Sequence, residues 1–135
     1  AGIPVVQLSL HAGLDPALHL QAGAALESLR NEGVLLVGSG MSFHNMQAYG
    51  DARFGPVSAA FDAWLGEVVA APGPERRAAL AEWERAPGAR LCHPPRAEEH
   101  LIPLMVVAGA AGDDAGHCVY RERVMHTLIS GFRFG

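Results

Sequence analysis

The 135-residue sequence contains no lysine, so all ten of its basic residues are arginine. These arginines are scattered along the chain, and the formal net charge is −4. A protein that binds the phosphate backbone of a nucleic acid carries a basic patch or stripe. The sequence therefore predicts no nucleic-acid partner.

Long apolar runs and paired cysteines are also missing. No stretch approaches the roughly 20 apolar residues of a membrane-spanning helix, and Ala1-Gly2-Ile3-Pro4 lacks the basic flank and apolar core of a signal peptide. Cys92 and Cys118 lie far apart, without the spacing of a disulfide framework or a zinc-thiolate site. We expect no membrane partner, a cytoplasmic location and two buried or idle thiols.

Two common catalytic loops are absent as well. The segment Gly38-Ser39-Gly40 lacks the third glycine of a dinucleotide-binding loop, and a P-loop would need a lysine. Neither Ser39 nor Ser42 stands in a Gly-x-Ser-x-Gly nucleophile elbow. These absences argue against nucleotide binding and against a serine esterase.

What the chain does contain is a strand–helix–strand pattern. Residues 5–10 and 34–37 are short apolar runs typical of buried strands. Between them, Asp15 is a good N-cap, Pro16 suits the first helical position, and apolar residues follow at steps of three and four until Gly33. Such a unit predicts a right-handed crossover in a parallel sheet, with ligands beyond the carboxyl ends of the strands.

The rest of the chain alternates between helical and extended patterns. We expect a helix from Pro56 to the break at 71–74, a helix from Pro74 to the turn at 87–88, an extended segment at 92–95, a helix over 101–111, and strands near 118–124 and 127–134. The predicted fold class is α/β, with a mostly parallel or mixed central sheet flanked by helices. Because residues 3–10 read as a strand with no polar lead-in, we also expect a fragment of a larger domain.

Seven histidines are many for this length, and histidine is both the commonest metal ligand and the side chain that titrates near neutral pH. Four of them lie on predicted loops or element ends, where side chains converge on ligands: His11, His44, His93 and His100. The other three are expected to face solvent, in the case of His19 and His117, or to be structural, in the case of His126.

Position alone leaves both functional and purely structural interpretations of these candidates open. His44 follows the predicted central strand in a glycine-containing loop, which suits a catalytic residue, but a histidine bonded to the backbone of that loop fits equally well. His100 stands at the head of a helix, where a neutral imidazole can bind a metal. His93 either orients substrate, supports a neighbouring ligand, or is a surface loop residue.

Several motifs, taken in order, resemble the LigB-type (class III) extradiol dioxygenases, specifically their 4,5-DOPA dioxygenase branch. They are the opening strand 4–9, the run 29–40 that leads to His44-Asn45, the stretch from His93-Pro94 through Glu99-His100 to Leu104 with Ala108-Gly109-Ala110, and the terminal Phe132-Arg133-Phe134-Gly135. The resemblance spans nearly the whole chain. Family members are longer, and their further metal-binding histidines come from an amino-terminal half that has no counterpart in this sequence.

The resemblance implies that residues 1–135 are the carboxy-terminal half of a LigB-like catalytic domain. It makes His100 a metal ligand, His44 the acid/base histidine that is sometimes also a ligand, and His93 a weaker candidate for substrate binding; His11 receives no role. The implied metal is Fe(II), with Zn(II) as a redox-silent substitute in a crystal. The implied reactants are a catechol and dioxygen, and the implied protein partner is the missing amino-terminal half or a separate chain.

Two other function classes remain open on the sequence. A non-catalytic interaction protein can use the same fold, because a fold does not fix a function, and a zinc-dependent hydrolase can use the same histidines without dioxygen. An exposed sheet edge would also favour pairing of two such chains into a homodimer. The dioxygenase and the hydrolase interpretations depend on one geometric expectation, that His44 and His100 lie across a common crevice.

Overall fold

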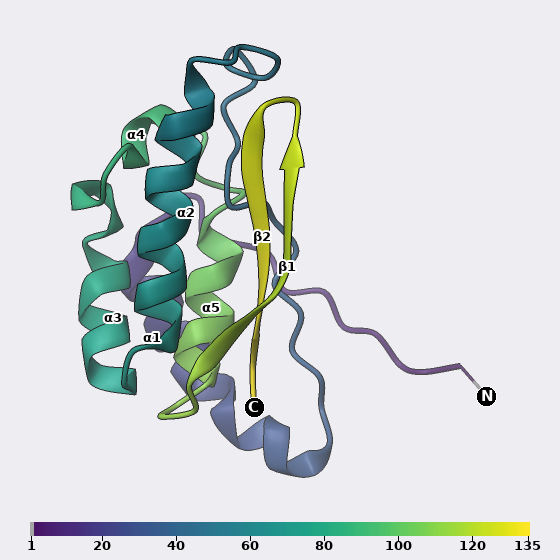
Figure 1. Cartoon of the computed structure of the whole chain (residues 1–135). Coiled ribbons are helices and arrows are strands. Elements are labelled where there is room, and N and C mark those ends of the chain that lie inside the picture. Colours follow the sequence, from purple (N-terminus) through teal and green to yellow (C-terminus); the bar gives the residue numbers. More distant parts are fainter. Residues whose placement is uncertain (1) are drawn as a thin grey trace.

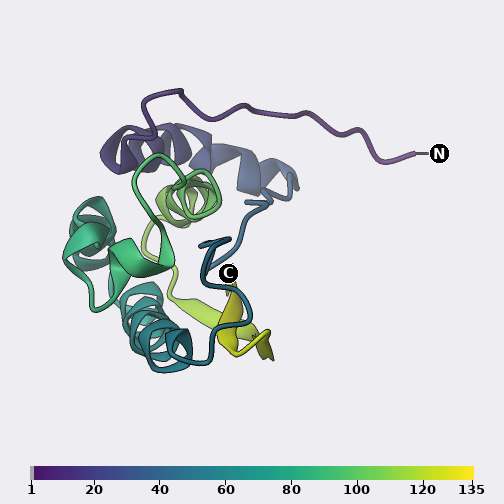
Figure 2. The same cartoon turned by 90° about the horizontal axis from the view of Figure 1, so that it is seen from above.

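A computed structural model describes residues 2–135 of the chain (Figure 1). In chain order its elements are α1 (Pro16–Leu26), the 3₁₀ segment η1 (Glu27–Glu32), α2 (Phe54–Ala70), α3 (Gly73–Ala81), the 3₁₀ turn η2 (Trp83–Arg85), α4 (Ala89–Cys92), α5 (Ile102–Ala110), β1 (Gly116–Val124) and β2 (Thr127–Phe134). The helices gather on one side, a β-hairpin lies beside them, and the amino-terminal segment extends away from both (Figures 1 and 2).

Helices α1 and α5 pack so closely that their backbones touch. A Cβ atom built on Gly23 would lie 1.9 Å from the carbonyl oxygen of Val106, and one built on Gly109 would lie 2.1 Å from that of Leu20. Only glycine permits so close an approach of two backbones. This contact fixes α5, and with it the residues that immediately precede α5.

Strands β1 and β2 form an antiparallel hairpin that packs against α2 through β2. Its two-residue turn consists of Met125 and His126, with φ angles of 47° and 73°. Positive φ at both positions is the geometry of a type I′ turn, whose twist matches that of the flanking strands. The inner strand is further attached to α2 by a bond from the Leu128 amide to Ser58 Oγ, 3.0 Å long.

The core lies between the helices and β2. Its largest fully buried side chains include Phe61, Leu65, Leu80, Trp83 and Met105. Helices α2 and α5 supply three core residues each, and their apolar faces have the three- and four-residue spacing seen in the sequence. The predicted helices and the predicted carboxy-terminal hairpin are therefore confirmed, and the α/β class with them.

The two strands expected at 5–10 and 34–37 are not formed. Both segments are extended, but within residues 2–135 the only sheet is the antiparallel hairpin, so the parallel crossover is absent. Their side chains are largely exposed, as for Val6 at 93% and Leu35 at 84%. Strand character in a sequence needs a partner backbone to become a sheet, and these segments have none among the described residues.

Two smaller expectations also need correction. The segment 92–95 is extended only from His93, because Cys92 ends the short helix α4. His19 is buried rather than solvent-facing, at 4% exposure. Of the two cysteines, Cys92 is buried and Cys118 is exposed. No helix in residues 2–135 is long and apolar enough to span a membrane.

Candidate metal centre

His44 lies in a segment, residues 41–45, whose backbone is bonded to two other parts of the chain. The His44 amide donates to the carbonyl oxygen of Cys92 at 3.0 Å, and the Met41 amide donates to that of His100 at 2.8 Å. The Ser42 hydroxyl accepts from the Ser130 amide of β2 at 2.8 Å. The segment is therefore held at several peptide groups and cannot shift as a free loop would.

The link between this segment and His100 depends on a glycine. A Cβ atom on Gly40 would lie 2.1 Å from the His100 carbonyl oxygen, so no other residue allows the two backbones to meet. As a result the imidazole rings of His44 and His100 stack, with ring centroids 3.6 Å apart and planes inclined by 22°. The structure thus brings His44 and His100 together, as was expected from the sequence.

A third side chain, Glu99, completes the cluster. One ligand atom from each of His44, Glu99 and His100 lies within 4.8 Å of the others, and the Glu99 carboxylate is 3.9 Å from His100 Nε2. Two imidazoles and one carboxylate with open positions are the ligand set typical of non-haem Fe(II) oxygenases. Glu99 was not among the residues expected from the sequence, although its place next to the candidate ligand His100 could have pointed to it.

The neighbouring carboxylate, Glu98, is directed elsewhere. It pairs with Arg90, whose guanidinium also binds Glu84 at 2.7 Å and lies 4.8 Å from the ring centre of Trp83. Burial raises the pKa of Glu98, but hydrogen bonding and charge attraction from Arg90 outweigh it and lower that pKa overall. Glu98 therefore stays ionised in its own ion pair, and only Glu99 is free to act in the cluster.

The electrostatics of the cluster keep His44 uncharged near neutral pH. Burial lowers the pKa of His44 below 6.5, repulsion by a protonated His100 lowers it further, and Glu99 partly offsets both. Its Nδ1 atom is buried and has no hydrogen-bond partner within residues 2–135. A neutral imidazole with a free lone pair can bind a metal ion or accept a proton.

His93 lies beneath the cluster rather than in it. Its side chain is completely buried, edge-on to Phe61 and Trp83, and its Nε2 donates to the carbonyl oxygen of Ser42 at 2.9 Å. A direct contact with substrate, as predicted, would require this ring to leave its place. The placement instead fits a residue that positions the segment carrying His44.

The remaining histidines lie outside the cluster. The His11 amide donates to His19 Nε2 at 3.1 Å, and His19 Nδ1 donates to the Asp15 carbonyl at 2.6 Å, so the His19 ring links residue 11 to the start of α1. His117 is exposed on β1, and His126 is exposed in the hairpin turn. Of the four loop candidates, the cluster contains His44 and His100.

Comparison with known proteins identifies a family. The model of the family LigB, described as the catalytic LigB subunit of aromatic ring-opening dioxygenase, matches residues 2–133. Dioxygenase tasH of Hapsidospora irregularis is 39% identical over 148 residues, which cover 100% of this chain and 45% of that protein. The 4,5-DOPA dioxygenase extradiol of Beta vulgaris is 40% identical over 117 residues, covering 85% of this chain and 42% of that protein.

A solved structure supports the same grouping. The crystal structure of an uncharacterized protein from Escherichia coli K12 matches with a TM-score of 0.84 and 28% sequence identity, over 98% of this chain and 56% of that chain. The chain therefore spans less than half the length of the curated relatives reported above and little more than half of the solved one.

Proposed function

The chain belongs to the LigB family of aromatic ring-opening dioxygenases, and we propose that it forms part of a non-haem, Fe(II)-dependent extradiol dioxygenase. The proposed substrates are dioxygen and a catechol, with a DOPA-like compound favoured by the names of the relatives. Cleavage of the ring next to the two hydroxyls retains both oxygen atoms of dioxygen and gives a muconic semialdehyde-type product. The reaction therefore needs no external reductant.

The observation that carries this proposal is the convergence of His44, Glu99 and His100. Their ligand atoms lie within 4.8 Å of one another, and the buried Nδ1 of His44 has no other partner in the described chain. Nitrogen and carboxylate donors in this number fit a divalent iron or zinc ion. The chemistry that Fe(II) supplies in such a site is electron exchange between a chelated catecholate and dioxygen.

The residues of this chain would bind the ion and move protons. His100 is the proposed metal ligand, with Glu99 beside it. His44 is the proposed acid/base residue: because its pKa is lowered, its ring is neutral near pH 7 and can take a proton from a catechol hydroxyl and return it as the ring opens. His93 would affect substrate orientation through its bond to Ser42, which fixes the segment that carries His44.

The proposed catalytic domain extends beyond these residues. Residues 1–135 correspond in this proposal to its carboxy-terminal half, because the curated relatives are more than twice as long as the part they share with this chain. The remaining ligands and much of the substrate pocket would come from the polypeptide that forms the rest of the fold. The chain by itself would bind Fe(II) weakly and turn over slowly or not at all.

The test combines the chain with the part of the Beta vulgaris relative that it does not match, produced as a separate polypeptide. After anaerobic loading with Fe(II), addition of DOPA and dioxygen should give a yellow semialdehyde and consume one dioxygen per product. His44→Ala should lower the rate about 100-fold or more, in line with loss of an acid/base group, whereas His117→Ala, at an exposed strand position, should not. A complex that contains stoichiometric iron but forms no product would refute the proposal.

A further inference from the structure

The extended segment 35–40 runs beside β2 without joining it. At one end Ser42 Oγ bonds to the Ser130 amide, and at the other Leu35 and Leu36 line a cavity together with Phe134. The two backbones therefore run in opposite directions (Figures 1 and 2). Between them lies a trough of about 310 Å³, lined by residues 35–38 and 40–42 of the segment, 130–134 of β2, residues of α5, and His100.

Both sides of this trough carry peptide groups that lack backbone partners. In β2 the amides of Leu128 and Ser130 donate to serine hydroxyls rather than to β1. Because peptide groups alternate between the two edges of a strand, Phe132 and Phe134 also direct their backbone groups to the trough. On the facing segment, none of the amides of 35–40 donates a backbone or side-chain hydrogen bond within the described chain, although Val34 and Met41 at its ends do.

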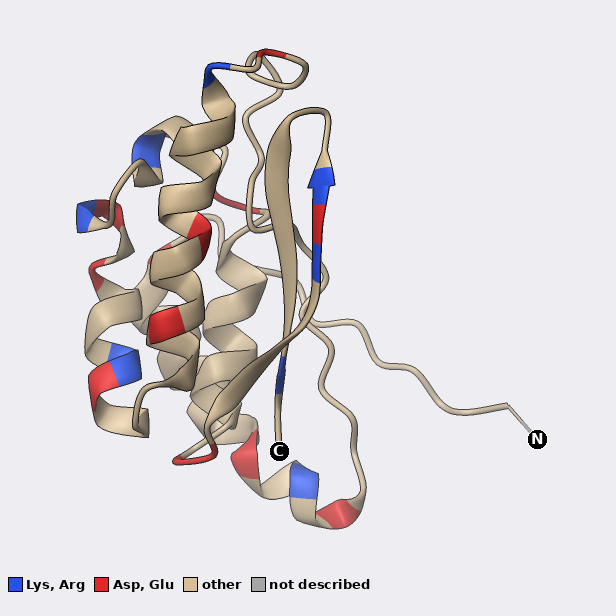
Figure 3. Cartoon of the chain, viewed as in Figure 1, with Lys and Arg blue, Asp and Glu red and all other residues tan. Residues whose placement is uncertain are grey.

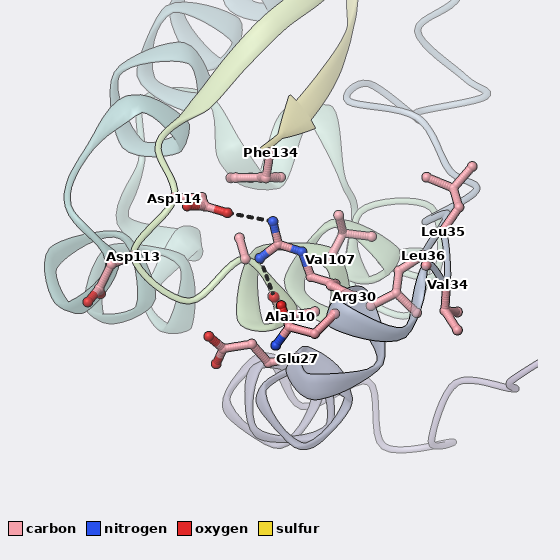
Figure 4. Close-up of a pocket in the computed structure, with 13 residues that line it drawn as sticks. Glu27, Arg30, Val34, Leu35, Leu36, Val107, Ala110, Asp113, Asp114 and Phe134 are labelled. Carbon is pink, nitrogen blue, oxygen red and sulfur yellow. Dashed lines mark hydrogen bonds and ion pairs between the residues drawn. The ribbon is translucent and has the colours of Figure 1, made fainter.

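The side chains around the trough are mostly apolar, and among the lining residues Arg133 of β2 carries a charge. Val34 and Leu35 point to opposite sides of the extended segment, as in a strand (Figure 4), and Leu35 and Val37 are 84% and 76% exposed. No charged residue occurs between 33 and 50, and that part of the chain is entirely tan in Figure 3. Edge strands left open in native proteins are usually protected by charges or proline, and the segment 35–40 has neither.

We propose that the trough binds one extended, apolar strand that pairs with Phe132 and Phe134 of β2 on one side and with 35–40 on the other. This strand belongs to the polypeptide that forms the rest of the LigB fold, so the inference rests on the proposed function. It locates the docking surface of that polypeptide beside His100. The completed sheet is mixed, because the two sides of the trough run in opposite directions and the inserted strand is parallel to only one of them.

The choice of occupant follows from the solved relative. Its structure matches 98% of this chain at a TM-score of 0.84, yet this chain accounts for only 56% of it. The extended segments of this chain therefore have counterparts inside a larger fold, where backbone groups at such positions find partners. A second copy of this chain, or a strand added to the exposed edge of β1, would be a different outcome.

The test compares two exposed valines. Val37 lies on the trough and its amide has no acceptor, while Val119 lies at the bulge of β1 and has no register partner. Val37→Pro and Val119→Pro should both leave the isolated chain folded, as checked by circular dichroism and thermal melting. The probe is the unmatched part of the Beta vulgaris relative as a separate polypeptide, titrated without metal or catechol.

The proposal expects Val37→Pro to weaken binding of this polypeptide about tenfold or more, and Val119→Pro to change it less than about twofold. In the complex, hydrogen exchange at the amides of 35–40 should slow about tenfold or more. Absence of a complex, unchanged exchange at 35–40, equal effects of the two prolines, or self-association of the chain through β1 would each overturn it. Binding without ring cleavage would refute the proposed function and leave the trough assignment intact.

Discussion

Acidification should destabilise this protein through His93, and the size of the effect follows from its burial. The ring is 0% exposed, donates from Nε2 to the Ser42 carbonyl, and has no partner for Nδ1 within the described chain. Burial is the main cause that lowers the pKa of His93 from 6.5 to about 4, and the charges of His44 and His100 add to it. The folded protein therefore holds this ring neutral well below the pH at which the unfolded chain protonates it.

The direction and magnitude follow from proton linkage. Above pH 6.5 the ring is neutral in both states, and the full contribution to stability is present. As the pH falls from 6.5 to 4, the unfolded chain binds a proton that the folded protein does not, so stability is lost. One pKa unit corresponds to about 1.4 kcal/mol, and the 2.5-unit difference between 6.5 and 4 gives a loss of about 3 kcal/mol by pH 4.

The assay is urea unfolding, followed by circular dichroism, at a series of pH values from 7.5 to 4. His93→Gln removes the titrating group but keeps a side-chain amide that can donate to Ser42. The difference in unfolding free energy between wild type and this variant should therefore narrow by about 3 kcal/mol as the pH falls from 7.5 to 4. Comparison of the two proteins cancels the contributions of the carboxylates and of His44, which both retain.

Val69→Ala is the matched control, because it removes buried volume and no titrating group. Its stability gap to wild type should be the same at pH 7.5 and pH 4. If the gap for His93→Gln were equally independent of pH, the premise that His93 is a buried neutral ring would be wrong.

Four further outcomes are expected. Gly109→Ala should lower the unfolding free energy by about 2 kcal/mol or more in urea titration, because its Cβ would overlap a carbonyl of α1. Arg76→Met should cost about 3 kcal/mol in the same assay, since the buried guanidinium donates to carbonyls at 69, 71, 112 and 114. His126→Gly should raise the melting temperature, because glycine tolerates the positive φ of the turn. Zn(II) should raise the melting temperature of the wild type, and His100→Ala should abolish that rise.

The helices could be predicted because their signals are local. Asp15 was expected to cap α1, and its carboxylate accepts from the Leu18 amide at 2.8 Å. A helix was expected over 101–111, and α5 spans Ile102–Ala110 with Pro103 in its first turn. Caps, proline positions and apolar spacing all act within a few residues of the chain, so one sequence is enough to find them.

The strands divide into those with a partner and those without. Residues 116–124 and 127–134 find each other across a two-residue turn, and both were predicted. Residues 5–10 and 34–37 have equally strong strand composition, but their pairing depends on backbone from elsewhere. Composition reports that a segment suits a sheet, and it contains no information on whether a neighbouring strand is present.

The candidate site could likewise be predicted only in part from the sequence. The sequence pointed to His44 and His100, and the structure joins them through the Met41 amide and the missing side chain of Gly40. It could not say which of two adjacent glutamates faces the rings. That choice is made by Arg90, which pairs with Glu98 and leaves Glu99 beside His100. The third member of the cluster is thus selected by an ion pair outside it, and replacing Arg90 would free both carboxylates to compete for the same position.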